Sequence, residues 1–177
     1  MRVIAGAYKG RRLTVPPGLD VRPTADRVRE ALFSILGERV AGARVLDLFA
    51  GSGALAIEAL SRGADSAVLV ERDRRAVAAI RANLDAIGDA GARVDPLDAL
   101  AWLGRARGEY DLVFLDPPYS SARDLGGRLS QALPAVLSKD AHIVTESDKR
   151  DPLILDFPLE DERTYGNTRV AIHRATD

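Results

Sequence analysis

From residue 43 onward, short apolar runs alternate with stretches in which apolar residues recur every three or four positions. The runs have the length of strands, and the periodic stretches have the spacing of helices with one buried face. Predicted strands are 43–50, 66–71, 91–96, 110–115 and 141–146. Predicted helices are 53–63, 73–88, 98–106 and most of 122–137, where the helix ends near Pro134. This alternation predicts an α/β fold with a mostly parallel sheet, in which ligands bind beyond the carboxyl ends of the strands. Segments 153–166 and 167–175 predict a closing hairpin.

The beginning of the chain follows a different pattern. Residues 1–21 form short extended pieces broken by Gly10 and by a Pro-Pro-Gly stretch, which predicts a β-hairpin extension before a main domain over 22–177. A helix follows, with Thr24 as the expected N-cap. Apolar positions mark its buried face, and we expect Arg29 to lie away from that face or on its edge.

Composition narrows the chemistry. With 177 residues, 46% of them hydrophobic, the chain suits one ordinary domain. Cysteine is absent, which excludes disulfides, thiolate metal sites and a cysteine nucleophile. Two histidines without metal-ligand spacing make a metal site improbable. No apolar run has the length of a membrane span and no signal-peptide pattern is present, so we expect a cytoplasmic protein. No apolar stripe is left over for a partner, which favours a monomer.

Charge is distributed unevenly along the chain. Residues 1–44 hold nine Lys/Arg and four Asp/Glu, a net +5, and the remainder holds 16 against 22, a net −6. A basic segment on an acidic body suggests a polyanionic partner. On charge alone, a solvated hairpin with incidental arginines fits equally well. The candidate phosphate contacts are Lys9, Arg11, Arg12 and Arg22.

A glycine turn ends the first predicted strand, in VLDLFAGSG at 45–53. Gly51 and Gly53 allow positive φ and close approach of the backbone to a ligand, and the following helix offers free N–H groups to it. Asp47 is a charge inside an apolar strand, which is costly without hydrogen bonds. Its carboxylate could receive a ligand ammonium group, could hold the glycine turn through backbone hydrogen bonds, or could do both.

Two acids follow the next strands. Glu71 ends the second strand, eighteen residues after Gly53, where an acid would bind the ribose hydroxyls of an adenosine. We favour that role over an ordinary exposed acid. Asp98 opens the short helix after the third strand. It could accept a hydrogen bond from an adenine amine or act as the N-cap of that helix, and the sequence does not decide between them.

The fourth strand stops at Asp116-Pro117-Pro118-Tyr119. Two adjacent prolines remove two backbone donors and fix two φ angles, so this corner is stiff, with a carboxylate at one end and an aromatic ring at the other. It is either a simple strand terminator or a preorganised site.

Taken together, VLDLFAGSG at 45–53, Glu71 and LDPPY at 115–119 resemble the motifs of class I S-adenosylmethionine-dependent methyltransferases. RVIAGAYKGRRL at 2–13, RPTADRVREALFSIL at 22–36 and YGNT at 165–168 are similar to the RsmD family of bacterial 16S rRNA methyltransferases, which modify the 2-amino group of a guanine. The resemblance covers nearly the whole chain, and the two N-terminal segments are its most specific part. It implies a Rossmann-like, seven-stranded sheet with an antiparallel last strand and a small N-terminal extension.

The resemblance also implies roles for individual residues. Asp116 and the Pro117 carbonyl would accept hydrogen bonds from the target amine, held rigid by Pro118, and Tyr119 would stack on the base. S-adenosylmethionine, which becomes S-adenosylhomocysteine, would contact the glycine turn, the acids and their neighbours: Asp47, Phe49, Gly51, Ser52, Gly53, Glu71, Arg72, Asp98, Ala99 and Asp116. No metal is implied.

The implied partner is 16S rRNA, within the 30S subunit or a late assembly intermediate. Three alternatives remain. An adenine-directed DNA or RNA methyltransferase would share DPPY, but the chain shows no separate DNA-reading domain. An NAD-dependent enzyme would explain the glycine turn but not DPPY. A non-catalytic RNA-binding assembly factor would not need the intact acids.

Overall fold

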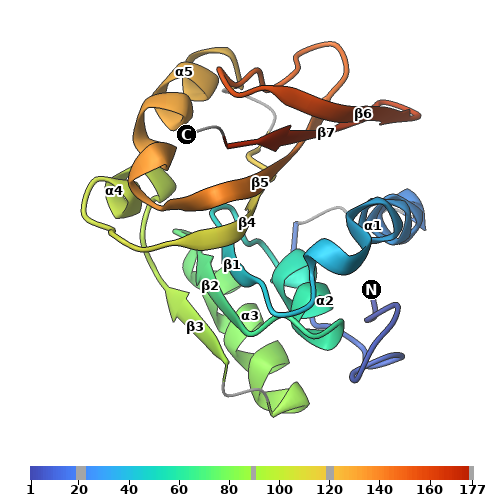
Figure 1. Cartoon of the computed structure of the whole chain (residues 1–177). Coiled ribbons are helices and arrows are strands. Elements are labelled where there is room, and N and C mark those ends of the chain that lie inside the picture. Colours follow the sequence, from blue (N-terminus) through green and yellow to red (C-terminus); the bar gives the residue numbers. More distant parts are fainter. Residues whose placement is uncertain (19–22, 89–90, 119–121, 176–177) are drawn as a thin grey trace.

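A computed structural model describes residues 1–18, 23–88, 91–118 and 122–175, and its centre is one seven-stranded sheet (Figure 1). The strand order is β3-β2-β1-β4-β5-β7-β6. All neighbouring pairs from β3 to β5 are parallel, whereas β7 runs antiparallel to both β5 and β6. The strand bounds are β1 Arg44–Asp47, β2 Ser66–Val70, β3 Ala92–Asp95, β4 Tyr110–Leu115, β5 Leu137–Asp148, β6 Leu159–Tyr165 and β7 Thr168–Arg174. The predicted Rossmann-like sheet with an antiparallel last strand is therefore confirmed.

Helices cover both faces of the sheet (Figure 1). Helices α1 (Pro23–Leu36), α2 (Ala54–Ser61) and α3 (Arg74–Ile87) contribute side chains to one hydrophobic core. Helices α4 (Ala99–Leu103) and α5 (Ala122–Ala132) contribute to the core on the other face. Across the described residues, no helix combines the length and the apolar character needed to cross a membrane.

Local sequence explains how the helices begin and end. The Asp73 side chain accepts hydrogen bonds from the backbone N–H groups of Arg75 and Ala76, which caps α3, and Gly88 ends that helix with φ of 68°. Glycine tolerates this left-handed conformation because it has no Cβ atom.

The helix predicted to end near Pro134 ends at Ala132 and continues only as a 3-10 turn over Leu133–Ala135, because Pro134 cannot extend an α-helix. Two strands differ in length from the prediction. The strand predicted over 141–146 is longer, since β5 pairs along its carboxyl half with β7. Within the predicted strand 153–166, only β6 is extended. Non-local pairing, which a local pattern does not contain, sets these limits.

The N-terminal segment, residues 1–18, folds back on itself without forming long strands. Arg2 and Arg12 form an isolated antiparallel bridge, and the Val3 N–H donates to the Arg11 carbonyl at 2.9 Å. Val3 and Leu13 enter the same core as α1, α2 and α3. The segment therefore packs directly on the sheet domain, and the boundary at residue 21 remains a prediction.

A buried acid on α2 fixes this segment in place. Glu58 has no exposed surface and accepts hydrogen bonds from the N–H groups of Ile4 (2.8 Å) and Ala5 (3.0 Å). Its other partners are the guanidinium groups of Arg62, at 2.8 Å, and Arg29, at 3.8 Å. A buried carboxylate with several donors is stabilised, whereas one without partners would be costly.

Arg29, predicted to lie away from the apolar face of α1 or on its edge, is nevertheless buried. Only 4% of its surface is exposed, and its guanidinium group donates to the Arg2 carbonyl. The helical pattern showed which face of α1 meets the sheet, but it could not show that the N-terminal segment covers a second face.

Replacing Glu58 by Gln should therefore destabilise the protein and loosen the N-terminal segment. The change removes a buried charge that Arg29 and Arg62 both face, and breaking such a pair costs about 3 kcal/mol. Urea unfolding and limited proteolysis would measure the two effects. Unchanged stability and unchanged cleavage of the first 18 residues would contradict this role for Glu58.

Candidate functional site

Part of the predicted functional set lies at the carboxyl ends of β1, β2 and β4. The chain passes from β1 to β2 on one side and returns to β4 on the other, so β1 lies between them. Such a point of reversal leaves a crevice beyond the strand ends, where ligands bind in open α/β sheets. The glycine turn, Glu71 and the Asp-Pro-Pro segment all border it.

The glycine turn leads from β1 into α2. Gly51 and Gly53 have φ of 57° and 78°, in the left-handed region that favours glycine. A Cβ atom on Gly53 would lie 3.0 Å from the Leu69 side chain, so a larger residue would also be crowded there. Gly53 is the N-cap of α2, whose free backbone N–H groups therefore follow directly after the turn.

Glu71 is tied to this turn. Its Oε2 accepts a hydrogen bond from the Gly51 N–H at 2.9 Å, and its Oε1 accepts one from the Asp73 N–H at 2.8 Å. Both carboxylate oxygens are thus fixed, and each retains further lone-pair capacity. A fixed pair of acceptors at the end of β2 fits the two neighbouring hydroxyls of a ribose.

Asp98 is the N-cap of α4, which was one of its two predicted roles. Its Oδ1 accepts hydrogen bonds from the N–H groups of Leu100 (3.0 Å) and Ala101 (3.1 Å). Its Oδ2 lies 3.7 Å from the Arg72 guanidinium group, and both side chains are exposed. An exposed pair of this kind is weak, so a ligand can separate it. Contact with an adenine amine stays a prediction for Asp98, and Ala99 beside it is buried.

Asp47 is the most constrained acid of the site. Only 1% of it is exposed, and its Oδ1 has no hydrogen-bond partner among the described residues. Burial raises the pKa of Asp47 to about 7; hydrogen bonds from the backbone of Phe49 and Ala56 oppose this shift, and nearby Glu71 adds to it. These backbone bonds hold the start of the turn, as predicted, and the unpaired oxygen fits a ligand cation such as an ammonium group.

The Asp-Pro-Pro corner follows β4 directly. Asp116 is half-buried, Pro117 is buried and Pro118 is exposed. Burial is the main cause that raises the pKa of Asp116 well above its usual value, followed by the negative charges of Glu146 and Asp47. Tyr119 lies outside the described residues, and so does Arg22.

Glu146 is a site residue that sequence reasoning missed. Leu115 of β4 pairs with Thr145 of β5, so Asp116 and Glu146 come next at the ends of neighbouring strands. Burial also raises the pKa of Glu146. The only sequence signal was a single acid ending an otherwise apolar strand, which is equally typical of an exposed end.

The three acids share one face of the sheet. Val45, Phe114 and Val144 all point into the core beneath α1 to α3. Because side chains alternate along a strand, the residues two positions further on point to the same face. Those residues are Asp47, Asp116 and Glu146, on three adjacent strands.

The other predicted cofactor and RNA contacts lie in separate parts of the structure. Ser52 is buried in the turn, and its hydroxyl group lies 3.5 Å from the Met1 sulfur. Phe49 is half-buried against the core of α4 and α5. Lys9, Arg11 and Arg12 are exposed on the N-terminal segment.

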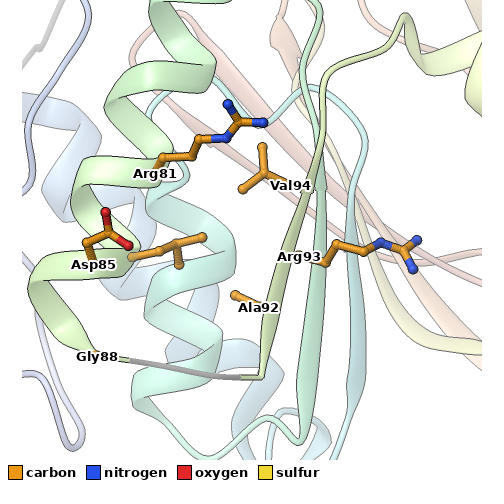
Figure 2. Close-up of a pocket in the computed structure, with 7 residues that line it drawn as sticks. Arg81, Asp85, Gly88, Ala92, Arg93 and Val94 are labelled. Atoms are coloured by element: carbon orange, nitrogen blue, oxygen red, sulfur yellow. The ribbon is translucent and has the colours of Figure 1, made fainter.

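A hollow of about 560 Å³ between α3 and β3 is separate from this crevice. Figure 2 shows Arg81 extending from α3 towards Val94, while Arg93 points away from α3. Its lining contains neither the glycine turn nor Glu71 nor the Asp-Pro-Pro corner, so we assign it no part in the chemistry. Within the described ranges, no group of three or more His, Asp or Glu side chains could hold a metal ion.

Known proteins resemble the chain over nearly its whole length. The family described as "Conserved hypothetical protein 95" matches residues 1–174. "Ribosomal RNA small subunit methyltransferase D" of Haemophilus influenzae is 33% identical over 177 residues, covering 94% of this chain and 89% of that protein. The Escherichia coli K12 protein of the same name is 44% identical over 119 residues, covering 67% and 60%. The solved structure of Escherichia coli yhhF has a TM-score of 0.86 at 35% identity, covering 99% and 98%.

The raised pKa of Asp47 predicts a pH-dependent stability. A carboxyl group with a folded-state pKa of about 7 binds its proton more tightly when folded, so its unfavourable ionisation lowers stability as pH rises from about 4 to about 7. Asp47→Asn should remove the contribution of this group. The free energy of unfolding of the ligand-free variant, relative to the parent protein, should therefore be about 4 kcal/mol higher at pH 8 than at pH 4. Urea unfolding at both pH values would measure it, with exposed Asp65→Asn as the control. An equal effect of Asp47→Asn at both pH values would contradict the prediction.

Proposed function

This chain belongs to the RsmD family of methyltransferases, and from that premise we propose that it transfers a methyl group from S-adenosylmethionine to the exocyclic 2-amino group of a guanine in 16S rRNA. The observation that carries the proposal is the Asp116-Pro117-Pro118 corner at the end of β4, next to the glycine turn and Glu71. Relatives named as small-subunit rRNA methyltransferases support the choice of RNA.

The donor side of the site has acceptors for the cofactor groups that donate hydrogen bonds. Glu71 would bind the ribose hydroxyls, and the unpaired Oδ1 of Asp47 would receive the ammonium group of the amino acid. The backbone between Gly51 and Gly53 allows close approach, and Asp98 is available to the adenine amine. S-adenosylmethionine supplies an electrophilic methyl group on a sulfonium sulfur, and S-adenosylhomocysteine is left as product.

On the acceptor side, the corner would orient a poor nucleophile. The lone pair of an exocyclic amine is delocalised into the base, so the amine must be held with that lone pair directed at the methyl carbon. The Asp116 carboxylate and the Pro117 carbonyl accept its two N–H groups, and the prolines fix both acceptors before the substrate arrives. The raised pKa of Asp116 suits it to take up the proton that the methylated nitrogen then releases.

Glu146 supports guanine over adenine as the target. Guanine presents an N1–H donor beside its 2-amino group, whereas adenine presents an N1 acceptor beside its 6-amino group. Two neighbouring carboxyl groups at the ends of β4 and β5 suit the two adjacent donors of guanine, the N1–H and the 2-amino group. With these carboxyl groups ionised, the adenine-directed alternative would place the N1 lone pair against a carboxylate, which is unfavourable.

The exposed basic residues of the N-terminal segment would hold the RNA. We propose that Lys9, Arg11 and Arg12 contact phosphates, together with Arg22, which lies outside the described residues. The target base has to leave its stack to reach the corner, and Tyr119 would then stack on it. The proposed substrate is the 30S subunit or a late assembly intermediate, bound by a monomeric, cytoplasmic enzyme.

Transfer of labelled methyl from S-adenosylmethionine to unmethylated small ribosomal subunits tests this function, with naked rRNA and DNA as parallel substrates and nucleoside analysis of the product. Label in 2-methylguanosine would support the proposal. Label in a methylated adenine would replace guanine by adenine as the target. No label in any substrate would favour a binding protein.

Asp116→Ala should reduce the methylation rate at saturating substrates by at least about 100-fold, because it removes an acceptor that positions the amine. Binding of the small subunit should stay within about twofold of the parent protein, since phosphates supply most of the affinity. Single-turnover kinetics and filter binding measure the two quantities, with exposed Asp85→Ala as the control. Full activity of the Asp116 variant would remove the corner from the mechanism.

Replacing Lys9, Arg11 and Arg12 together by Ala should weaken RNA binding and lower the slope of log affinity against log salt by about 2 to 3, because each phosphate contact releases about one counterion. A charge-matched control replaces Arg150, Arg163 and Arg174, on the opposite part of the sheet around β6 and β7. Equal effects of the two triple variants would mean that net charge, not this segment, determines binding.

A further inference from the structure

Asn83 on α3 is a buried amide whose hydrogen bonds reach two other parts of the chain. Only 2% of it is exposed. Its Nδ2 donates to the carbonyl of Thr14 at 2.9 Å and to the carbonyl of Ser52 at 3.0 Å, and its Oδ1 accepts from the Thr14 N–H at 2.6 Å. The side chain thus uses both donors and its acceptor on backbone groups.

The two parts that Asn83 joins have different proposed tasks. Thr14 lies two residues after Arg12, in the segment that carries the exposed basic residues. Ser52 is the central residue of the glycine turn, between Gly51, whose N–H bonds to Glu71, and Gly53. One amide therefore connects the RNA-contacting segment with the turn that would bind the cofactor.

A second, weaker contact joins the same two parts. The Ser52 hydroxyl lies 3.5 Å from the Met1 sulfur, and the Met1 carbonyl accepts a hydrogen bond from Leu13 at 3.1 Å. By contrast, Glu58 anchors the N-terminal segment through Ile4 and Ala5, and none of its hydrogen bonds reaches the glycine turn. The segment therefore has one anchor that touches the turn and one that does not.

We infer that Asn83 is a positioning residue that couples RNA contact on the N-terminal segment to cofactor binding at the glycine turn. The inference rests on the proposed function. Glycines at positive φ give the turn alternative backbone conformations, and the Asn83 bond to the Ser52 carbonyl selects one of them. RNA that orders the segment fixes Thr14, which in turn holds the Asn83 amide in place.

Coupling of this kind is reciprocal. If RNA tightens cofactor binding by some factor, the cofactor tightens RNA binding by the same factor. Such factors commonly lie between about 5 and 150. The complex of enzyme, cofactor and RNA would then form more readily than either binary affinity predicts.

The test measures S-adenosylhomocysteine binding by calorimetry, with and without unmethylated small subunits. For the parent protein we expect subunits to tighten this binding by at least about fivefold. Asn83→Ala should weaken binding about tenfold without subunits, because the Ser52 carbonyl loses its donor, and should abolish the tightening. In steady-state assays it should raise KM for S-adenosylmethionine and leave kcat within about twofold, a split that simple loss of stability would not produce.

Two further variants separate the steps. Thr14→Pro removes the N–H that donates to the Asn83 Oδ1, and it also fixes φ at residue 14 and removes the hydroxyl group. The Asn83 bond to the Ser52 carbonyl is retained, so binding without subunits should stay within about twofold while the tightening by subunits falls. Glu58→Gln loosens the other anchor, and binding without subunits should again be retained. If Asn83→Ala does not fold, Thr14→Pro decides.

The coupling would be overturned if a folded Asn83→Ala variant bound S-adenosylhomocysteine with the affinity of the parent protein and subunits tightened that binding as in the parent. It would also be overturned if subunits tightened binding to a folded Thr14→Pro variant as they do for the parent. Tightening absent from the parent protein would also overturn it, while label in 2-methylguanosine would leave the proposed function standing. A parent protein that neither binds S-adenosylhomocysteine nor methylates would overturn both.

Discussion

The structure depends on the burial of one carboxyl group at the end of β1. Asp47 closes a strand that is covered on both faces, and burial of its carboxyl group raises its pKa to about 7. The backbone on both sides of the glycine turn, at Phe49 and at Ala56 in α2, donates hydrogen bonds to it, so satisfying this acid constrains the path of the chain between them. The same path brings the Gly51 N–H within hydrogen-bond distance of the Glu71 carboxylate. Because this burial is unfavourable, we expect a ligand cation to bind beside the carboxylate. Without that ligand, the buried acid lowers the stability of the protein.

The fold could be predicted from the sequence because its elements follow local patterns. Continuous apolar runs are typical of parallel strands with helices on both sides, and the glycine turn with its acids indicated which strand ends form the site. Glu71 and Asp98 lie where the spacing placed them. What the sequence did not contain is which residues meet across the chain. Arg29 is buried because the N-terminal segment covers it, and Glu146 joins the site because β5 lies beside β4.

Polar residues inside apolar patterns could have predicted further contacts between distant parts of the chain. Glu58 is the single charge in the helical stretch ALAIEALS, and Asn83 interrupts the apolar face of α3. Both are fully buried, and both bind backbone groups of the N-terminal segment. A buried polar side chain is retained only where it has partners, so each of them indicates an interaction with a distant segment. The partner itself becomes known only from the structure.

The position of β7 has a consequence for the order in which the molecule can assemble. β7 is the latest strand in the sequence, yet it lies inside the sheet, between β5 and β6. Until it pairs, the carboxyl half of β5 is an open edge, and Glu146 has no strand opposite it, because its partner in the ladder is Val170. An open edge of this kind can pair with another chain. The acidic face proposed to receive the base is therefore completed by a strand that is synthesised after β5 and β6, so a partly made chain would have the glycine turn and Glu71 but not yet this face complete.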